Sequence, residues 1–288
     1  MEPWLDELRG RLPRHAALID GLLDLCDRDA RIRVLELQCS VARGAGDELS
    51  DLDMGVAATE SDWEAVAADL PDRLRSLADC VEVHSHTIPE WGGRAHRRLF
   101  VQYADGRQLD VVVQPVTNLG GRVPGAIVLY DPDGHLERER RVPSAVATGE
   151  DVAAWERLGW ELLANLAKYI ARGSAWEALE RLGQARDMAL RLWAAAESVP
   201  YPVFGLTSLL DADPPRLPAG LDATVAGLDL AELTEAGRAC AALLRTCADA
   251  ARAALTPGAT SSPMGAYVEG LLRFPRSTRG TSDAGSDA

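Results

Sequence analysis

The sequence predicts an α/β domain built on a mixed sheet, followed by a C-terminal α-helical bundle. Through about residue 142, short β-favouring runs alternate with helical segments and with turns rich in Gly, Ser and Asp. From residue 151 the chain is rich in Ala and Leu, follows the helical period and contains no convincing strand. A length of 288 residues allows about two domains. We therefore place the α/β domain at residues 1–142 and the helical domain at residues 151–273.

The first domain is expected to open with one helix and to continue through a series of strands. Apolar side chains recur at the helical period across residues 3–27. Asp105-Gly106 lies between two β-favouring runs and is a strong hairpin signal. Strands are expected at residues 32–39, 52–57, 80–87, 97–103, 108–114 and 126–130, with a further helix at 61–69.

The second domain is expected to consist of helices with recognisable ends. Gly173 stops the first helix, and Ser174 with Glu177 has the spacing of a capping box that starts the second. The tail at residues 276–288 is rich in Ser, Gly and Asp and is expected to be disordered. Helices are expected at residues 151–172, 174–196, 229–255 and 263–272.

The charge balance excludes some classes of partner. The chain has 30 Lys and Arg residues against 44 Asp and Glu residues, which gives a net charge of −14. Such a field repels polyanions, so we expect neither a nucleic-acid partner nor binding to an anionic membrane. A cationic small molecule would be attracted instead.

The cysteines and the N-terminal segment predict a cytoplasmic protein. The 5 cysteines are odd in number and widely scattered, which argues against a disulfide framework and for a reducing compartment. Charged residues interrupt the first thirty positions, so the apolar centre of a signal peptide is missing. No stretch approaches the roughly 18 apolar residues of a membrane span.

Two carboxylates stand one residue apart in a β-favouring segment. Asp51 and Asp53 therefore project from the same face of the expected strand. Two anions held that close repel each other unless a cation lies between them, and Mg²⁺ is bound by one or two carboxylates together with substrate phosphates. The pair also has a plainer interpretation, in which an Asx turn begins the strand and Asp53 is solvated.

The loop before this pair has residue types that bind phosphate. Ser40 offers a hydroxyl, Arg43 a guanidinium, and Gly44 and Gly46 allow backbone N–H groups to approach an anion. A third carboxylate, Asp110, interrupts a run of strand-forming apolar residues, where a charge needs a partner or a function. Asp110 could also be a hairpin residue that faces water.

A basic stretch, His96, Arg97 and Arg98, follows Gly92-Gly93. It has two interpretations: a mobile loop that binds substrate or phosphate, or the solvated edge of a β-hairpin. Its place in an expected strand favours the hairpin edge.

Together these residues resemble the nucleotidyltransferase superfamily that shares its fold with DNA polymerase beta. The signature of that superfamily is a Gly-Ser or Gly-Gly turn, roughly ten residues, Asp-x-Asp or Asp-x-Glu, and a third acid on a later strand. Here the turn is Cys39-Ser40, with Cys39 where the family usually has glycine, and the acids are Asp51, Asp53 and Asp110. Ala42-Arg43-Gly44 and Ser50-Asp51-Leu52-Asp53 are typical of the bacterial antibiotic-modifying branch, which includes kanamycin and lincosamide nucleotidyltransferases. The resemblance covers residues 10–135.

The resemblance implies an enzyme that moves a nucleoside monophosphate, such as AMP from ATP or the equivalent from another nucleoside triphosphate, onto a hydroxyl and releases pyrophosphate. Two Mg²⁺ ions would be held by Asp51, Asp53 and Asp110. Asp110 would either bind one metal ion or take the proton of the attacking hydroxyl. Ser40 and Arg43 would hold the triphosphate.

The resemblance also implies that the helical domain closes over the nucleotide and supplies a basic residue. Lys168 is the candidate, because it is the single lysine of the chain. Glu161, Asn165, Lys168 and Arg172 are spaced to line one polar face of a helix. A solvated face with internal salt bridges would explain the same spacing.

The acceptor is expected to be a hydroxylated small molecule, and an aminoglycoside-like antibiotic would suit the acidic chain. Two alternatives remain open. One is a protein-modifying nucleotidyltransferase that resembles the antitoxin of a two-component system. The other is a nucleotide-binding interaction protein without turnover, for which Cys39 is the hint. The sequence leaves open whether the chain acts alone or as a homodimer.

Overall fold

The computed structural model describes residues 3–91, 94–139, 146–212 and 214–273. The chain forms two compact units, Met1–Val142 and Pro143–Ala288. The tail at residues 276–288, which we predicted to be disordered, lies outside the described residues. None of the helices in the described ranges has the length and apolar character needed to cross a lipid bilayer.

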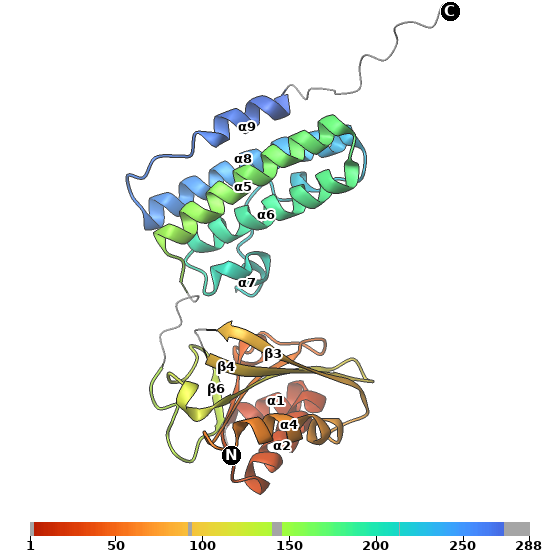
Figure 1. Cartoon of the computed structure of the whole chain (residues 1–288), viewed down its shortest axis with the longest axis vertical. Helices are drawn as coiled ribbons and strands as arrows, with labels where there is room; N and C mark the ends of the chain where they lie inside the picture. The colour runs from red at the N-terminus through yellow and green to blue at the C-terminus, as the bar shows by residue number, and fades with distance from the viewer. Residues whose placement is uncertain (1–2, 92–93, 140–145, 213, 274–288) are drawn as a thin grey trace, which may run out of the picture. The chain divides into compact units, whose positions relative to one another are not determined.

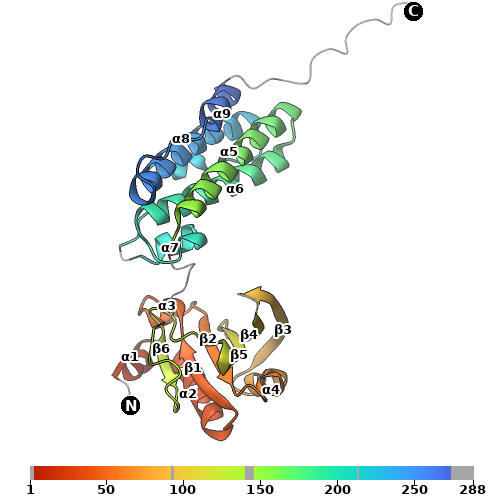
Figure 2. The ribbon, with the colours of Figure 1, turned by 60° about the vertical axis from the view of Figure 1, so that its left-hand side comes forward.

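The N-terminal unit contains one six-stranded mixed sheet. Its strands are β1 (Ile32–Leu37), β2 (Leu52–Ala58), β3 (Cys80–Trp91), β4 (Arg94–Tyr103), β5 (Gln108–Pro115) and β6 (Ile127–Tyr130). They lie in the order β3-β4-β5-β2-β1-β6 (Figure 2). β2 runs parallel to β5, and the other neighbouring pairs are antiparallel. The central parallel pair brings together two strands that are far apart in the sequence.

Three helices, α1 (Pro3–Arg11), α2 (Pro13–Arg28) and α4 (Trp63–Arg75), pack on one face of this sheet (Figure 2). Side chains alternate along a strand, so every second residue of β2 and β5 enters the core beneath these helices. The residues between them point to the opposite face, and these include Asp53 and Asp110. The core residues of the two strands are Leu52, Met54, Val56, Ala58, Leu109, Val111 and Val113.

The structure differs from the sequence prediction near the N-terminus. The single helix expected over residues 3–27 is two helices, because Pro13 cannot continue the hydrogen-bond ladder of α1 and instead starts α2. The strand expected over residues 32–39 ends at Leu37, since Cys39 already begins the short helix α3 (Cys39–Ala42). The other expected strands are confirmed, although β3 continues to Trp91.

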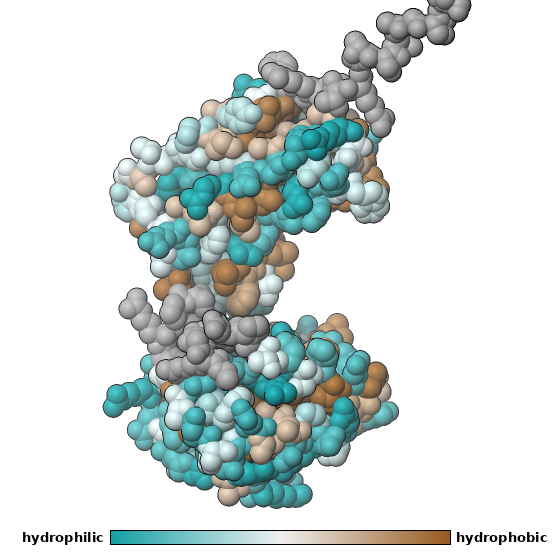
Figure 3. All heavy atoms as spheres, in the orientation of Figure 1, coloured by the Kyte–Doolittle hydropathy of each residue, from teal (hydrophilic) through white to brown (hydrophobic). Residues whose placement is uncertain are grey.

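The C-terminal unit is helical. α5 (Gly149–Arg172), α6 (Ala175–Ala196) and α8 (Leu230–Leu255) pack on one another, and α9 (Met264–Arg273) lies against α5 and α8 (Figures 1 and 2). The short helix α7 (Leu206–Leu210) contacts α6. Leu and Ala side chains fill most of the core. On the face shown in Figure 3, both units are mainly hydrophilic, with smaller apolar patches between the polar residues. The mixed sheet of the N-terminal unit and the helices of the C-terminal unit confirm the predicted fold class.

The ends of the long helices follow their sequence signals with one exception. Gly173 adopts a left-handed conformation with φ of 73° and ends α5, as expected. Asp229 caps α8 by accepting hydrogen bonds from the N–H groups of Ala231 and Glu232. The expected capping box at Ser174 is wrong, because its side chain makes no capping hydrogen bond. A complete capping box forms instead at the start of α5, between Thr148 and Asp151.

Candidate active site

The three acids predicted from the sequence come from two neighbouring strands. Asp53 on β2 and Asp110 on β5 are direct partners in the parallel register. Both lie on the sheet face that the three N-terminal helices leave open. Asp51 immediately precedes β2, two residues from Asp53. The register of the parallel pair thus brings Asp110 beside a carboxylate pair that is remote from it in the sequence.

The electrostatics of Asp53 reflect this arrangement. Burial, together with the negative charges of Asp51 and Asp110, raises the pKa of Asp53 to about 6. A hydrogen bond from the Cys39 thiol and the charge of Arg98 act in the opposite direction. A carboxylate in such a position is stabilised by added positive charge.

Asp110 is held by Arg98, one of the basic residues that the sequence assigned either to a mobile loop or to a hairpin edge. Nε of Arg98 donates to Oδ1 and to Oδ2 of Asp110 at 2.8 Å each, and its Nη2 also donates to Oδ2. Arg98 belongs to β4, so the interpretation as a mobile loop is wrong. The Asp105-Gly106 hairpin pairs Phe100 with Asp110. Arg98 is then the diagonal neighbour of Asp110 on the same face, which the predicted hairpin could have indicated.

Cys39 occupies a strained position next to Asp53. Its φ is +56°, in the left-handed region that favours glycine. Partial burial and the negative charge of Asp53 raise the pKa of the Cys39 thiol to about 12, so the group stays protonated and donates to Asp53. The position at which the family usually has glycine is therefore one at which the backbone itself favours glycine.

The loop between Cys39 and Asp51 is fixed by side chains of the first two helices. Arg11 donates to the carbonyls of Gly44 and Gly46 at 2.9 and 3.2 Å. The buried His15 bonds through Nε2 to the carbonyl of Ser50 at 2.8 Å. Since Ser50 directly precedes the first acid, Arg11 and His15 position the acids without touching them.

The predicted phosphate cradle is formed only in part. The backbone N–H groups of Arg43, Gly44 and Ala45 donate to carbonyls of the same loop, so they do not point at an anion. Arg43 itself is exposed, and its charge lowers the pKa of the Cys39 thiol, which places the guanidinium near the acids. The hydroxyl of Ser40 and the guanidinium of Arg43 stay predicted phosphate contacts.

The three acids suit a divalent cation, although they do not yet form a complete ligand set. Within the described ranges, no three side chains of His, Cys, Asp or Glu are grouped closely enough to hold a metal ion. Asp110 is instead bonded to Arg98. The chemistry of the donors still fits Mg²⁺, because they are carboxylates and one of them has its pKa raised by burial and by the charges of the other two.

Lys168, predicted to reach the nucleotide phosphates, is exposed on α5. Its Nζ donates to Oδ1 of Asn165 at 2.7 Å and lies 4.7 Å from the centre of the Tyr169 ring. Nδ2 of Asn165 donates in turn to the carbonyl of Glu161 at 3.1 Å. The polar face expected from the sequence is thus present. Its internal contacts fit a solvated face as well as they fit a face that contacts the nucleotide.

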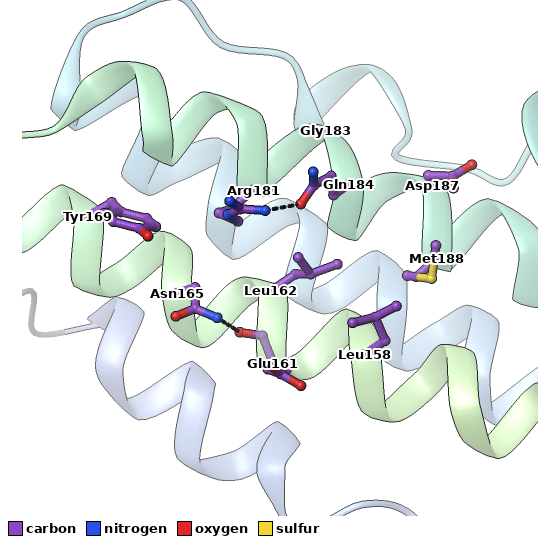
Figure 4. Close-up of a pocket in the computed structure, with 10 residues that line it drawn as sticks. All are labelled: Leu158, Glu161, Leu162, Asn165, Tyr169, Arg181, Gly183, Gln184, Asp187 and Met188. Atoms are coloured by element: carbon purple, nitrogen blue, oxygen red, sulfur yellow. Dashed lines mark hydrogen bonds between the residues drawn. The ribbon is translucent and has the colours of Figure 1, made fainter.

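This polar face borders a groove between α5 and α6 with a volume of about 630 Å³ (Figure 4). Leu158 lines this groove, and its side chain is 43% exposed although the helical period of α5 places it among buried leucines. The groove combines an apolar floor with carboxylate, amide and guanidinium groups. It is lined by Leu158, Glu161, Leu162, Asn165, Tyr169, Arg181, Gly183, Gln184, Asp187 and Met188.

Comparisons with known proteins add little beyond this geometry. No protein-family model matches the chain, and no curated protein sequence is similar to it. A solved structure described as an aminoglycoside 6-adenyltransferase from Bacillus subtilis is similar over 88% of this chain and 97% of its own, at 16% identity and a TM-score of 0.41. A likeness at that level does not establish the family or the substrate of this chain.

Proposed function

We propose that this protein is an Mg²⁺-dependent nucleotidyltransferase that moves a nucleoside monophosphate from a nucleoside triphosphate, such as ATP, to a hydroxyl of a small molecule. The proposal rests on one observation above all. Asp51 and Asp53 at β2 lie beside Asp110 on β5, and burial together with the charges of the other two acids raises the pKa of Asp53. A fold that builds such repulsion on an open sheet face has a use for a cation there.

The residues of the chain have distinct parts in the proposed reaction. Asp51, Asp53 and Asp110 would hold Mg²⁺, which supplies positive charge to the phosphates as negative charge develops on them. Ser40 and Arg43 would bind the triphosphate from the loop after β1. Arg11 and His15 fix that loop, so the acids need not reorganise during the reaction.

The chemistry is an in-line displacement at phosphorus. The hydroxyl oxygen of the acceptor forms a bond to the α-phosphorus, and the bond from that phosphorus to the bridging oxygen breaks. Pyrophosphate leaves with the electron pair. The proton of the hydroxyl goes to a carboxylate, for which Asp110 is the candidate if it does not bind metal, or to water.

The acceptor class follows from charge. With a net charge of −14, the protein attracts cationic molecules and repels polyanions. A hydroxylated polycation such as an aminoglycoside antibiotic fits this field, and its modification would confer resistance.

Cys39 supports a second candidate, a nucleotide-binding protein without turnover. Its thiol donates to Asp53 from a strained backbone position, and both features distinguish it from the glycine that the family usually has there. Such a protein would bind nucleotide in the presence of Mg²⁺ and release no pyrophosphate.

The test is pyrophosphate release from each nucleoside triphosphate with Mg²⁺, across a panel of aminoglycosides, lincosamides and other hydroxylated molecules. We expect release that requires one acceptor. Asp53→Asn should lower the rate by more than about 100-fold, the scale on which transition-state charge is stabilised. Its thermal stability without metal should stay the same or increase, because a carboxylate with a raised pKa is removed.

The matched control is Asp72→Asn, which makes the same change on the exposed surface of α4, where Asp72 pairs with Arg75. This variant should keep full activity. Equal rates for the Asp53→Asn and Asp72→Asn variants would refute the assignment of the acids. Nucleotide binding without release across the panel would favour the non-catalytic candidate or a protein acceptor.

A further inference from the structure

Arg98 is the cation that the chain itself brings to the acids. β4 and β5 are antiparallel neighbours (Figure 2). Arg98 reaches Asp110 because the two residues are diagonal partners on the open face of the sheet. Its planar guanidinium bonds to both carboxylate oxygens of Asp110. The charges of Asp53 and Asp51 also act on Arg98 and raise its pKa. The guanidinium of Arg98 thus interacts with all three carboxylates.

The two partners of this ion pair differ in their freedom to move. The Asp110 side chain is 11% exposed and short, and the central strand β5 holds its backbone in place. The Arg98 side chain is 45% exposed and long, so it can turn into water without leaving a charge buried. A buried carboxylate without a partner is unfavourable, so Asp110 requires some cation at all times.

We propose that Arg98 is a resident counter-ion that occupies Asp110 in the metal-free protein and is displaced when a divalent cation binds. The inference rests on the proposed function, since it takes the three acids as the metal site. The guanidinium competes with the cation for the same carboxylate oxygens, and therefore weakens metal binding in the absence of nucleotide. The site is thereby kept intact between turnovers without a tightly bound metal ion.

The test is Mn²⁺ binding to the full-length protein without nucleotide, measured by isothermal titration calorimetry and by the metal-induced rise in melting temperature. Arg98→Met removes the charge and keeps most of the side-chain length. We expect the R98M variant to bind Mn²⁺ about fivefold more tightly than the wild type, the scale of a partly exposed ion pair. Its metal-free melting temperature should be lower, and its rise with Mn²⁺ larger.

Two further variants serve as controls. Arg97→Met makes the same change one residue away, on the opposite face of β4, where Arg97 pairs with Val113 of the core. It should bind Mn²⁺ as the wild type does. Arg98→Lys keeps the charge but loses the two-pronged contact, so its affinity should lie between those of the wild type and R98M.

Affinity of R98M equal to or below that of the wild type overturns the inference, and so does a failure of both proteins to bind Mn²⁺. These outcomes are separate from the test of function. Tighter binding in R98M without any pyrophosphate release would uphold the role of Arg98 and reject the transferase. Pyrophosphate release by the wild type together with unchanged Mn²⁺ affinity in R98M would uphold the transferase and reject the role of Arg98.

Discussion

Each unit contains a carboxylate with low exposure that is bonded to an arginine, and the two pairs are built differently. In the helical unit, Glu156 on α5 and Arg252 on α8 have side chains that are 8% and 10% exposed. Glu156 also accepts a hydrogen bond from the N–H of Ser262, and Arg252 also pairs with Asp249. In the N-terminal unit, the side chain of Asp110 is similarly buried, but that of its partner Arg98 is 45% exposed.

The difference separates a structural pair from an exchangeable one. Both side chains of the Glu156 and Arg252 pair are buried, and the pair joins α5, α8 and the segment before α9. Neither charge can therefore turn into water as the partner of another ion. The pair at Asp110 is open on the arginine side and stands beside two further acids. Burial of both partners indicates a role in the fold, whereas burial of the carboxylate alone leaves room for another cation.

The largest expected effect concerns the closed pair. Arg252→Met leaves Glu156 buried with one backbone donor and should lower the free energy of unfolding of the helical unit by about 3–5 kcal/mol. Urea denaturation followed by circular dichroism measures this. The double variant Arg252→Met with Glu156→Gln removes both charges and should recover much of the loss. Arg238→Met on the same helix removes an ion pair with the exposed Glu235 and hydrogen bonds to the carbonyls of Leu272 and Arg273. A loss from Arg252→Met no larger than that from Arg238→Met would contradict the distinction between the two pairs.

The open site should respond to pH. Because the pKa of Asp53 is raised to about 6, protons compete with metal below that pH, and Mn²⁺ affinity should fall about tenfold between pH 7 and pH 5. In the metal-free protein, lowering the pH has the opposite effect and raises the free energy of unfolding. The folded state binds the proton more readily than the unfolded state, so this group adds stability as pH falls from 7 towards 4, and that stability is lost as pH rises through 6.

Calorimetric titrations at several pH values, and melting curves with and without metal, test both parts of this prediction. Asp53→Asn should weaken Mn²⁺ binding at every pH and remove the pH dependence of the metal-free melting temperature. A Mn²⁺ affinity that is constant from pH 7 to pH 5 would contradict the raised pKa of Asp53.

A smaller effect is expected from backbone strain. Gly173 has a φ of 73°, where glycine is unstrained, and Cys39 has a φ of 56°, a strained conformation that Ser198 and Tyr201 of the helical unit share. Cys39→Gly should therefore raise the free energy of unfolding by about 1 kcal/mol, and Gly173→Ala should lower it by a similar amount. Cys39→Ala keeps the strain and controls for loss of the thiol. A destabilised Cys39→Gly variant would show that the thiol's bond to Asp53 outweighs the strain.

The smallest effect concerns Lys168. As an exposed residue, its replacement by alanine should change the free energy of unfolding by less than about 0.5 kcal/mol. If it reaches the nucleotide, the KM for the nucleoside triphosphate should rise about three- to fivefold, as for an exposed charge pair. Arg172→Ala, on the same predicted face, is the control. Equal kinetics in the two variants would leave Lys168 as part of a solvated face.

Local features of the sequence were sufficient for most of the elements. The Asp105-Gly106 turn and its flanking runs predict β4, β5 and their register, because a tight turn determines which residues face each other. Asp51 and Asp53 share a face because side chains alternate along any strand. The split of the first helix at Pro13 was also available from the sequence, since proline cannot donate within a helix.

Contacts between residues that are far apart in the chain could not be predicted from the sequence. The hydrogen bonds from Arg11 and His15 to the loop before Asp51 join residues whose spacing follows no local period. The exposure of Leu158 depends on how α5 and α6 pack, and its helical spacing is the same as that of its buried neighbours.

The sequence by itself determined the kinds of element, their approximate ends, the acidic character of the chain and the identity of its three clustered acids. Those properties depend on composition, on local conformational preference and on the fixed periods of helix and strand. Tertiary structure alone decided that β2 pairs in parallel with β5 and that the resulting charge raises the pKa of Asp53. It also left Asp110 bonded to an exposed arginine, because burial and pairing are set by what other strands bring to the same face.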